Sequence, residues 1–138
     1  MTAGPLVTMP QSCLDAADQL LSNVVRGTRG AWPRACAWLL RLALEAAMDD
    51  YWQRCHPEVL PMRARSPQFL ILDRYAGRRI AARAGYAWSA LSRAGHHHCY
   101  ELGLTAGELH RLREMVATII SDLAAEQVVR RRGVDEDA

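Results

Sequence analysis

The sequence predicts an all-α protein, built as an antiparallel four-helix bundle with an additional short helix. Three observations support this fold class. Ala and Leu dominate the 138 residues while β-branched residues are few, and apolar residues recur every three or four positions. The connections between the expected helices are short, which places consecutive helices side by side in opposite directions. We expect a single domain over residues 1–138, with an ordered bundle over about 10–129 and a flexible tail over 130–138.

The first two expected helices are separated by a glycine-containing connection. Pro10 and Ser12 introduce a first helix to about Val25, and a second helix extends from Trp32 to about Arg54. Their apolar positions predict the faces that form the core. These positions are Leu14, Ala17, Leu20, Leu21 and Val24 in the first helix, and Ala35, Trp38, Leu39, Leu42, Ala46 and Tyr51 or Trp52 in the second.

Two further helices are expected in the middle of the chain. Ser66 and Pro67 are typical of a helix cap and first turn, and the short helix that they begin should end at Arg74 or one residue earlier. The next helix begins around Gly77 and ends at Gly95, because glycine readily adopts the left-handed conformation that closes a helix. Its apolar positions are Ile80, Ala84, Ala87, Trp88 and Leu91.

The last long helix has the clearest start signal. Thr105 followed by Glu108 forms a capping box, in which each side chain can satisfy a backbone N–H group at the start of the helix. We expect this helix to extend to about Val129. Its buried face should consist of Leu109, Leu112, Met115 or Val116, Ile119 and Leu123.

The charge and cysteine content restrict the function only weakly. The net charge is +2, and all 17 basic residues are arginine, the cation best matched to phosphate. This excludes a strongly basic nucleic-acid-binding domain but is consistent with a local basic patch. The four cysteines form no Cys-x-x-Cys pair, no segment reaches membrane-spanning length, and no signal peptide is recognisable. We therefore expect a cytoplasmic protein without a membrane partner.

The segment just before the last helix carries the most informative residues. Arg93 is followed after four residues by His98, and Tyr100 lies two positions further on. An arginine offers a permanent planar cation to a phosphate, and a histidine can transfer a proton near neutral pH. Together they can act on a phosphodiester without a metal. This arrangement resembles the signature of the HEPN superfamily of small all-helical RNases, most closely the toxins paired with minimal nucleotidyltransferases.

The resemblance implies a metal-independent endoribonuclease that needs no cofactor and acts as a toxin or defence effector. His98 would remove or relay the proton of a 2′-hydroxyl, and Arg93 would stabilise the charge that develops at the phosphorus. Related proteins form symmetric dimers in which two motifs face one cleft. The resemblance therefore implies RNA as the substrate, a homodimer, and a nucleotidyltransferase-type antitoxin as partner. Tyr100 either contacts substrate, accepts adenylyl groups from such a partner, or packs on the last helix.

The spacing of the motif constrains its geometry. Five positions on an ideal helix turn through roughly 500°, which leaves about 140° between Arg93 and His98. The two side chains can share a site only if the helix breaks at Gly95 or if a second copy of the chain contributes. His96 and His97 either orient substrate or lie exposed, and we favour exposure.

Two observations nearby lead to alternatives. Arg79 and Arg83, on the helix that leads into the motif, either guide RNA toward Arg93 or pair with nearby acids. Ala94 follows the arginine where the HEPN family usually has a polar residue, often asparagine. This departure favours an alternative function, in which the chain is a catalytically inactive HEPN-like helical module that serves dimerisation or the binding of a partner or RNA.

Other chemistry-bearing residues are expected to be structural. The histidines and Cys99, with Cys55 and His56 elsewhere, suggest zinc, but no standard ligand spacing occurs and we expect no metal. Glu45 and Asp49 share a helix face, which we expect to be a solvated surface. The four tryptophans lie within apolar stripes, so we expect them in the core rather than on a surface that stacks bases.

Overall fold

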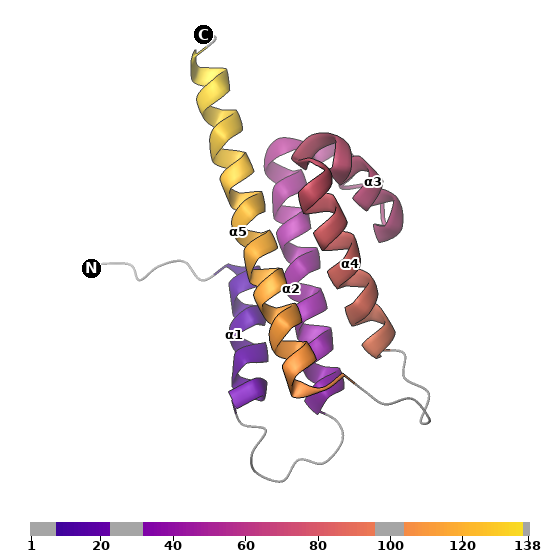
Figure 1. Cartoon of the computed structure of the whole chain (residues 1–138). Coiled ribbons are helices and arrows are strands. Elements are labelled where there is room, and N and C mark those ends of the chain that lie inside the picture. The colour runs from indigo at the N-terminus through magenta and orange to yellow at the C-terminus, as the bar shows by residue number, and fades with distance from the viewer. Residues whose placement is uncertain (1–7, 23–31, 96–103, 137–138) are drawn as a thin grey trace, which may run out of the picture.

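The computed structural model describes residues 8–22, 32–95 and 104–136, and most of them are helical (Figure 1). No strand occurs within these ranges, which confirms the predicted all-α fold class. Five α-helices and one 3₁₀ turn are found in this part of the chain. They are α1 (Met9–Ser22), α2 (Trp32–Cys55), η1 (Pro57–Val59), α3 (Arg65–Ala76), α4 (Arg78–Gly95) and α5 (Ala106–Glu136).

α2 is the central helix of the arrangement. It contacts α1, α4 and α5, and Figure 1 shows α1 and α4 on opposite sides of it. Along the chain, α1, α2, α4 and α5 alternate in direction, and α3 packs on α4. This arrangement is compatible with the expected antiparallel bundle and additional short helix.

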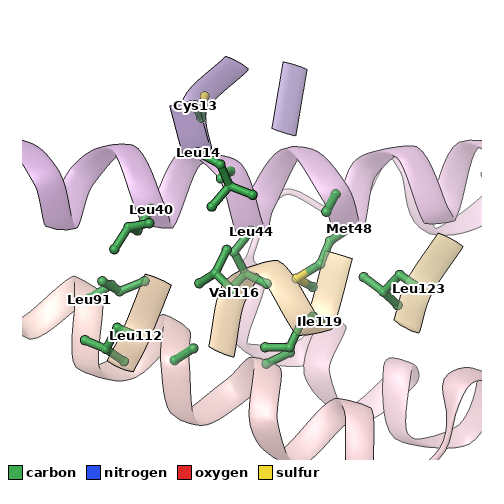
Figure 2. Close-up of a cluster of buried hydrophobic side chains, with 14 of the residues drawn as sticks. Cys13, Leu14, Leu40, Leu44, Met48, Leu91, Leu112, Val116, Ile119 and Leu123 are labelled. Carbon is green, nitrogen blue, oxygen red and sulfur yellow. The ribbon is translucent and has the colours of Figure 1, made fainter. Parts of the chain in front are cut away.

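The core lies where α2 meets the other helices. Leu40, Leu44 and Met48 occupy successive turns of α2 and are fully buried. In Figure 2 they lie among Leu14 of α1, Leu91 of α4 and several side chains of α5. Burying a side chain of this size contributes about 1.5–3 kcal/mol, so packing rather than helix propensity holds the helices together. The α5 side chains are Leu112, Val116, Ile119 and Leu123.

A polar contact joins α5 to α1 at the edge of this core. Arg113 donates two hydrogen bonds to Asp18, from Nε to Oδ1 at 2.8 Å and from Nη2 to Oδ2 at 2.9 Å. The hydrogen bond with Asp18 raises the pKa of the Arg113 guanidinium. Cys36 of α2 is fully buried close by, with Sγ 3.9 Å from the carbonyl oxygen of Ala17. Burial, reinforced by the charge of Asp18, raises the pKa of this thiol to about 11, so Cys36 is an inert core residue.

The buried face of α2 differs from the predicted face. Ala35 and Trp38 were expected in the core but are exposed, Trp38 to 56%. Tyr51 and Trp52 are fully buried as expected. Because three helices cover α2, apolar residues occupy most of its circumference and their spacing does not single out one side. By contrast, the apolar positions predicted in α4 and α5 all belong to the core or pack against it.

The boundaries of α3 show where local sequence signals were insufficient. Ser66 is not the cap: the helix begins at Arg65, its N-cap is Ala64, and no side chain caps it. The first residue of the helix makes a tertiary contact instead, because the Arg65 side chain donates to both carboxylate oxygens of Asp49 of α2. α3 then continues to Ala76, past the expected end. Gly77 caps it with φ 97°, donating its N–H to the carbonyl oxygen of Asp73 at 3.2 Å.

The predicted bounds of α4 and α5 can be compared with the observed helices. α4 is helical as far as Gly95, after which the residues lie outside the described part of the chain, so its predicted end there stays a prediction. Thr105 caps α5 by accepting the backbone N–H of Glu108 on its Oγ1 at 3.1 Å, which confirms the predicted start. The expected end at Val129 is wrong, because α5 extends to Glu136 and its last turns project beyond the other helices (Figure 1). A helix already nucleated adds residues at little cost, and the arginines there are good helix formers.

Candidate functional site

Arg93 lies in the last turn of α4 with its side chain exposed. It makes no hydrogen bond or ion pair with any residue that the structure describes. The opposite side of the same turn is apolar, because Leu91 and Ala94 are buried in the core, with 1% and 9% of their surface exposed. The core thus fixes the backbone of Arg93 and leaves its guanidinium in solvent, where a cation at a helix C-terminus is favourable.

The residues expected to act with Arg93 lie outside the described part of the chain. These are His96, His97, His98 and Tyr100. The described part of α4 reaches Gly95, so neither the break expected there nor its alternative, a second copy of the chain, is tested. The convergence of Arg93 and His98 on one site stays a prediction.

The exposed face of α4 is basic along its length. The helix contains four arginines and no acidic residue, although the whole chain carries a net charge of only +2. Arg79, Arg83, Tyr86 and Arg93 are separated by four, three and seven positions, which places them on one side of the helix. Within the described residues, Arg79 and Arg83 have no acidic partner. Both alternatives for these two arginines, guidance of RNA and pairing with nearby acids, stay predictions.

A shallow groove of about 280 Å³ lies between α4 and α5. Arg83 and Arg111 bring two guanidinium groups to it, and neither has a partner among the described residues. The single carboxylate of the groove, that of Glu114, accepts a hydrogen bond from Nη1 of Arg113 at 3.2 Å. The groove therefore carries an excess of positive charge beside the exposed face of α4. Its walls are Arg83 from α4 and Arg111, Glu114, Met115 and Thr118 from α5.

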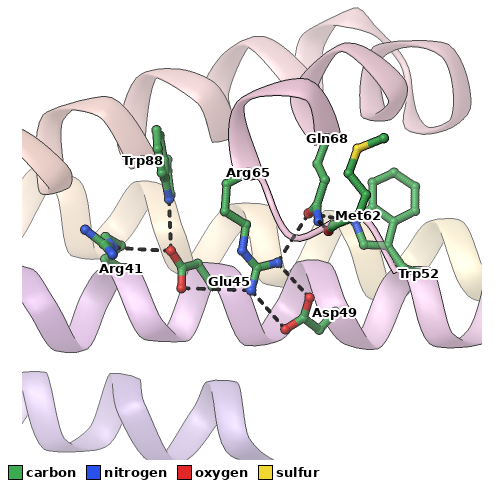
Figure 3. Close-up of polar contacts among 8 residues, drawn as sticks. All are labelled: Arg41, Glu45, Asp49, Trp52, Met62, Arg65, Gln68 and Trp88. Carbon is green, nitrogen blue, oxygen red and sulfur yellow. Dashed lines mark hydrogen bonds and ion pairs between the residues drawn. The ribbon is translucent and has the colours of Figure 1, made fainter. Parts of the chain in front are cut away.

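Sequence reasoning missed a polar cluster on the other side of α4 (Figure 3). Glu45 of α2 accepts hydrogen bonds on Oε1 from Nε1 of Trp88 at 3.0 Å and from Nε of Arg41 at 3.2 Å. Arg65 of α3 donates to both oxygens of Asp49, at 2.6 and 3.1 Å, and its Nη2 lies 3.9 Å from Oε2 of Glu45. The hydrogen bond with Asp49 raises the pKa of the Arg65 guanidinium.

The expected solvated surface is therefore wrong at Glu45, whereas the Asp49 side chain remains 47% exposed. The Glu45 side chain is only 16% exposed, and both carboxylates are engaged by arginine. The cluster continues to Gln68, which accepts from the Trp52 indole at 3.2 Å and donates to the carbonyl oxygen of Met62 at 2.7 Å. The spacing of the two carboxylates on one helix face was visible in the sequence, but their arginine comes from another helix. We interpret this cluster as the support of α3 and α4 on α2, because basic groups neutralise its acids.

The described residues contain no group of three or more His, Cys, Asp or Glu side chains placed to hold a metal ion. His96, His97, His98 and Cys99, on which the zinc alternative depends, lie outside those residues. Within the part of the chain that the structure describes, no helix combines the length and the apolar character needed to cross a bilayer.

Comparisons with known proteins do not place the chain in a family. No family model matches it, and no curated protein or solved structure shows significant similarity to it.

Proposed function

We propose that this protein is a metal-independent endoribonuclease of HEPN type, acting in the cytoplasm as a toxin or defence effector. The observation that carries the proposal is the position of Arg93. Its guanidinium is exposed at the end of α4, has no partner among the described residues, and immediately precedes the segment that contains His98. A solvent-facing arginine beside a histidine-rich segment suits an attack on a phosphodiester. In this proposal the fold is an antiparallel four-helix bundle of α1, α2, α4 and α5, with α3 as the additional helix.

The proposed reaction uses the substrate's own nucleophile. His98 takes the proton of a ribose 2′-hydroxyl, whose oxygen attacks the adjacent phosphorus and displaces the 5′-oxygen of the next nucleotide. Arg93 stabilises the additional negative charge on the phosphorane oxygens. The products are a 2′,3′-cyclic phosphate and a free 5′-hydroxyl, and DNA resists because it lacks the attacking hydroxyl.

The experiment that tests this proposal is RNA cleavage by purified protein in the presence of a metal chelator. Arg93→Ala should reduce the rate by about 10²–10³-fold, and His98→Ala by about 10²–10⁴-fold. Arg63→Ala is the matched control, since Arg63 is also exposed and without a partner among the described residues. Cleavage that survives both motif substitutions would exclude the proposed site.

The proposal includes a homodimer, because a second copy could supply the histidine that faces Arg93. Mixing Arg93→Ala and His98→Ala subunits tests this directly. If each site combines residues of two subunits, the mixed dimer retains one intact Arg93–His98 pair and recovers part of the activity of the unmodified protein. A monomer in sedimentation equilibrium, or no recovery in the mixture, would exclude a shared site.

The alternative is a catalytically inactive module that dimerises or binds a partner or RNA. The burial of Ala94 favours it, because the residue after the arginine here contributes a methyl group to the core and no polar contact. This alternative predicts no cleavage of structured or unstructured RNA by any form of the protein. Under either function, Tyr100 and a nucleotidyltransferase-type antitoxin remain proposals, tested by mass analysis of Tyr100 after co-expression with such an enzyme.

A further inference from the structure

We infer that single-stranded RNA binds along the exposed face of α4, with phosphates on Arg79, Arg83 and Arg93 and a base stacked on Tyr86. The inference rests on the proposed function only in taking RNA as the ligand and Arg93 as the end of the track. We call Arg79, Arg83, Tyr86 and Arg93 the α4 stripe.

Positive charge is concentrated on α4, the helix that carries the stripe. α4 carries a charge of +4 within a chain of net charge +2, so the remainder of the protein is slightly acidic. Elsewhere, Arg65 and Arg113 are bound by carboxylates. The three stripe arginines have no such partner among the described residues, so their charge is available to phosphates.

Tyr86 indicates the kind of nucleic acid. Its side chain lies between Arg83 and Arg93 along the stripe and is 60% exposed, so the ring is accessible to a ligand. An exposed aromatic side chain among arginines can stack an unpaired base, whereas the bases of a duplex are already stacked on one another. The α4 stripe therefore fits a single strand better than a double helix.

The dimensions and the neighbouring groove agree with this ligand. Arg79 and Arg93 are 14 positions apart, or about 21 Å along the helix axis, and a stacked strand advances about 3.4 Å per nucleotide. The stripe thus matches about six stacked nucleotides, or fewer in an extended strand. Arg111 lies across the groove from Arg83 and widens the positive surface, while Glu114 opposes it.

Binding is measured with a fluorescent 2′-O-methyl oligouridylate of about ten nucleotides, which cannot be cleaved because its 2′-oxygen carries no proton. The full-length protein is titrated at several salt concentrations. Replacing Arg79 and Arg83 together by Gln should weaken binding and reduce the slope of log K against log salt by about 1.4, since each phosphate contact with a single strand contributes about 0.7. The matched control is the double change Arg63→Gln and Arg74→Gln, two exposed arginines outside α4 that also lack partners among the described residues.

Two further substitutions separate stacking from charge. Tyr86→Leu should weaken binding about tenfold and leave the salt slope unchanged, whereas Tyr86→Phe should bind like the unmodified protein, because a ring without its hydroxyl still stacks. Glu114→Gln should tighten binding by removing the one carboxylate of the groove. Tyr86 and Glu114 are both exposed, so circular dichroism should show that these three variants keep the fold.

Either of two results would overturn the inference: equal binding by the stripe and control variants, or a duplex that binds as tightly as the single strand with no effect of Tyr86→Leu. The outcome is separable from that of the proposed function. Stripe-dependent binding without cleavage of any RNA would refute the nuclease and leave the binding surface intact. If the Arg79→Gln, Arg83→Gln double variant cleaves RNA and binds it with unchanged affinity, the binding surface is refuted and the nuclease stands.

Discussion

Glu45 is the side chain through which three helices are oriented on one another. Its Oε1 accepts hydrogen bonds from Trp88 of α4 and Arg41 of α2, and its Oε2 lies within ion-pair distance of Arg65 of α3. Because the carboxylate is largely removed from water, these donors replace the hydration that it has lost. Their loss would therefore affect the placement of α4, the helix that carries Arg93.

Replacing Arg65 tests the cluster. Arg65→Met should lower the free energy of unfolding by about 1–3 kcal/mol, because it deprives Asp49 and Glu45 of a partner. Asp49 is 47% exposed, so solvent offsets part of its loss and the lower half of that range is expected. Urea unfolding followed by circular dichroism measures the change, and Arg63→Met should stay within about 0.5 kcal/mol of the unmodified protein. Equal stability of the two variants would contradict the role given to the cluster.

Cys36 should make stability depend on pH in alkaline solution. Burial raises the pKa of its thiol from 9.0 to about 11, so the folded state keeps a proton that the unfolded chain loses. The contribution of this group to stability is complete below pH 9 and is lost as the pH rises through 11, by about 3 kcal/mol in total. The curve of unfolding free energy against pH should fall more steeply for the unmodified protein than for Cys36→Ala. Parallel curves between pH 9 and 11 would show that the thiol ionises as readily in the folded state.

At the scale of the helices, two glycines have opposite roles that a pair of substitutions can reveal. Gly77 caps α3 at φ 97°, where a Cβ meets no atom within 4 Å but the backbone disfavours any other residue. Gly77→Ala should therefore destabilise the protein by about 1–3 kcal/mol.

Gly85 lies inside α4, where a Cβ would be 3.9 Å from Cγ of Phe69, an ordinary contact. Gly85→Ala should stabilise by about 0.5–1 kcal/mol through helix propensity. Thermal unfolding measures both, and a shift of the same sign in the two variants would contradict these assignments.

The helices differ in how much of their structure was readable from the sequence. α5 was predicted well at its start and along its buried face because one side contacts the core and Thr105 supplies a local cap. α2 was located correctly, but its buried face was not, because neighbours on three sides remove the single-sided pattern. The start of α3 was missed because no side chain caps it, and its first residue is held by Asp49, which is distant in sequence.

The candidate site was predictable to a similar, limited degree. The types and spacing of Arg93 and His98 are local properties of the sequence, and so is the basic face of α4 once the helix is recognised. The groove between α4 and α5 was not predictable, since it depends on which turn of α5 lies beside Arg83. The polar cluster likewise requires knowledge of how α2, α3 and α4 pack.

In the molecule as a whole, one side of α4 is packed against the protein and the other side is exposed. The apolar core and the Glu45 cluster hold α4 on one side, while the opposite side presents arginines that the described residues leave unpaired. In the proposed function, this basic outer face and Arg93 hold a phosphate chain beside the segment that contains His98. In the proposed function, the homodimer places two such helices around one cleft.

The most direct test of the central claim uses an RNA bond that the protein is found to cleave. The same oligonucleotide is resynthesised with a single 2′-deoxynucleotide on the 5′ side of that bond, and cleavage is measured with the unmodified protein and with Arg93→Ala. We expect the deoxy substitution to abolish cleavage at that bond alone, the all-ribose product to end in a 2′,3′-cyclic phosphate, and Arg93→Ala to be slower by about 10²–10³-fold. Undiminished cleavage beside the deoxynucleotide, or by Arg93→Ala, would contradict the claim that Arg93 assists attack by the 2′-hydroxyl.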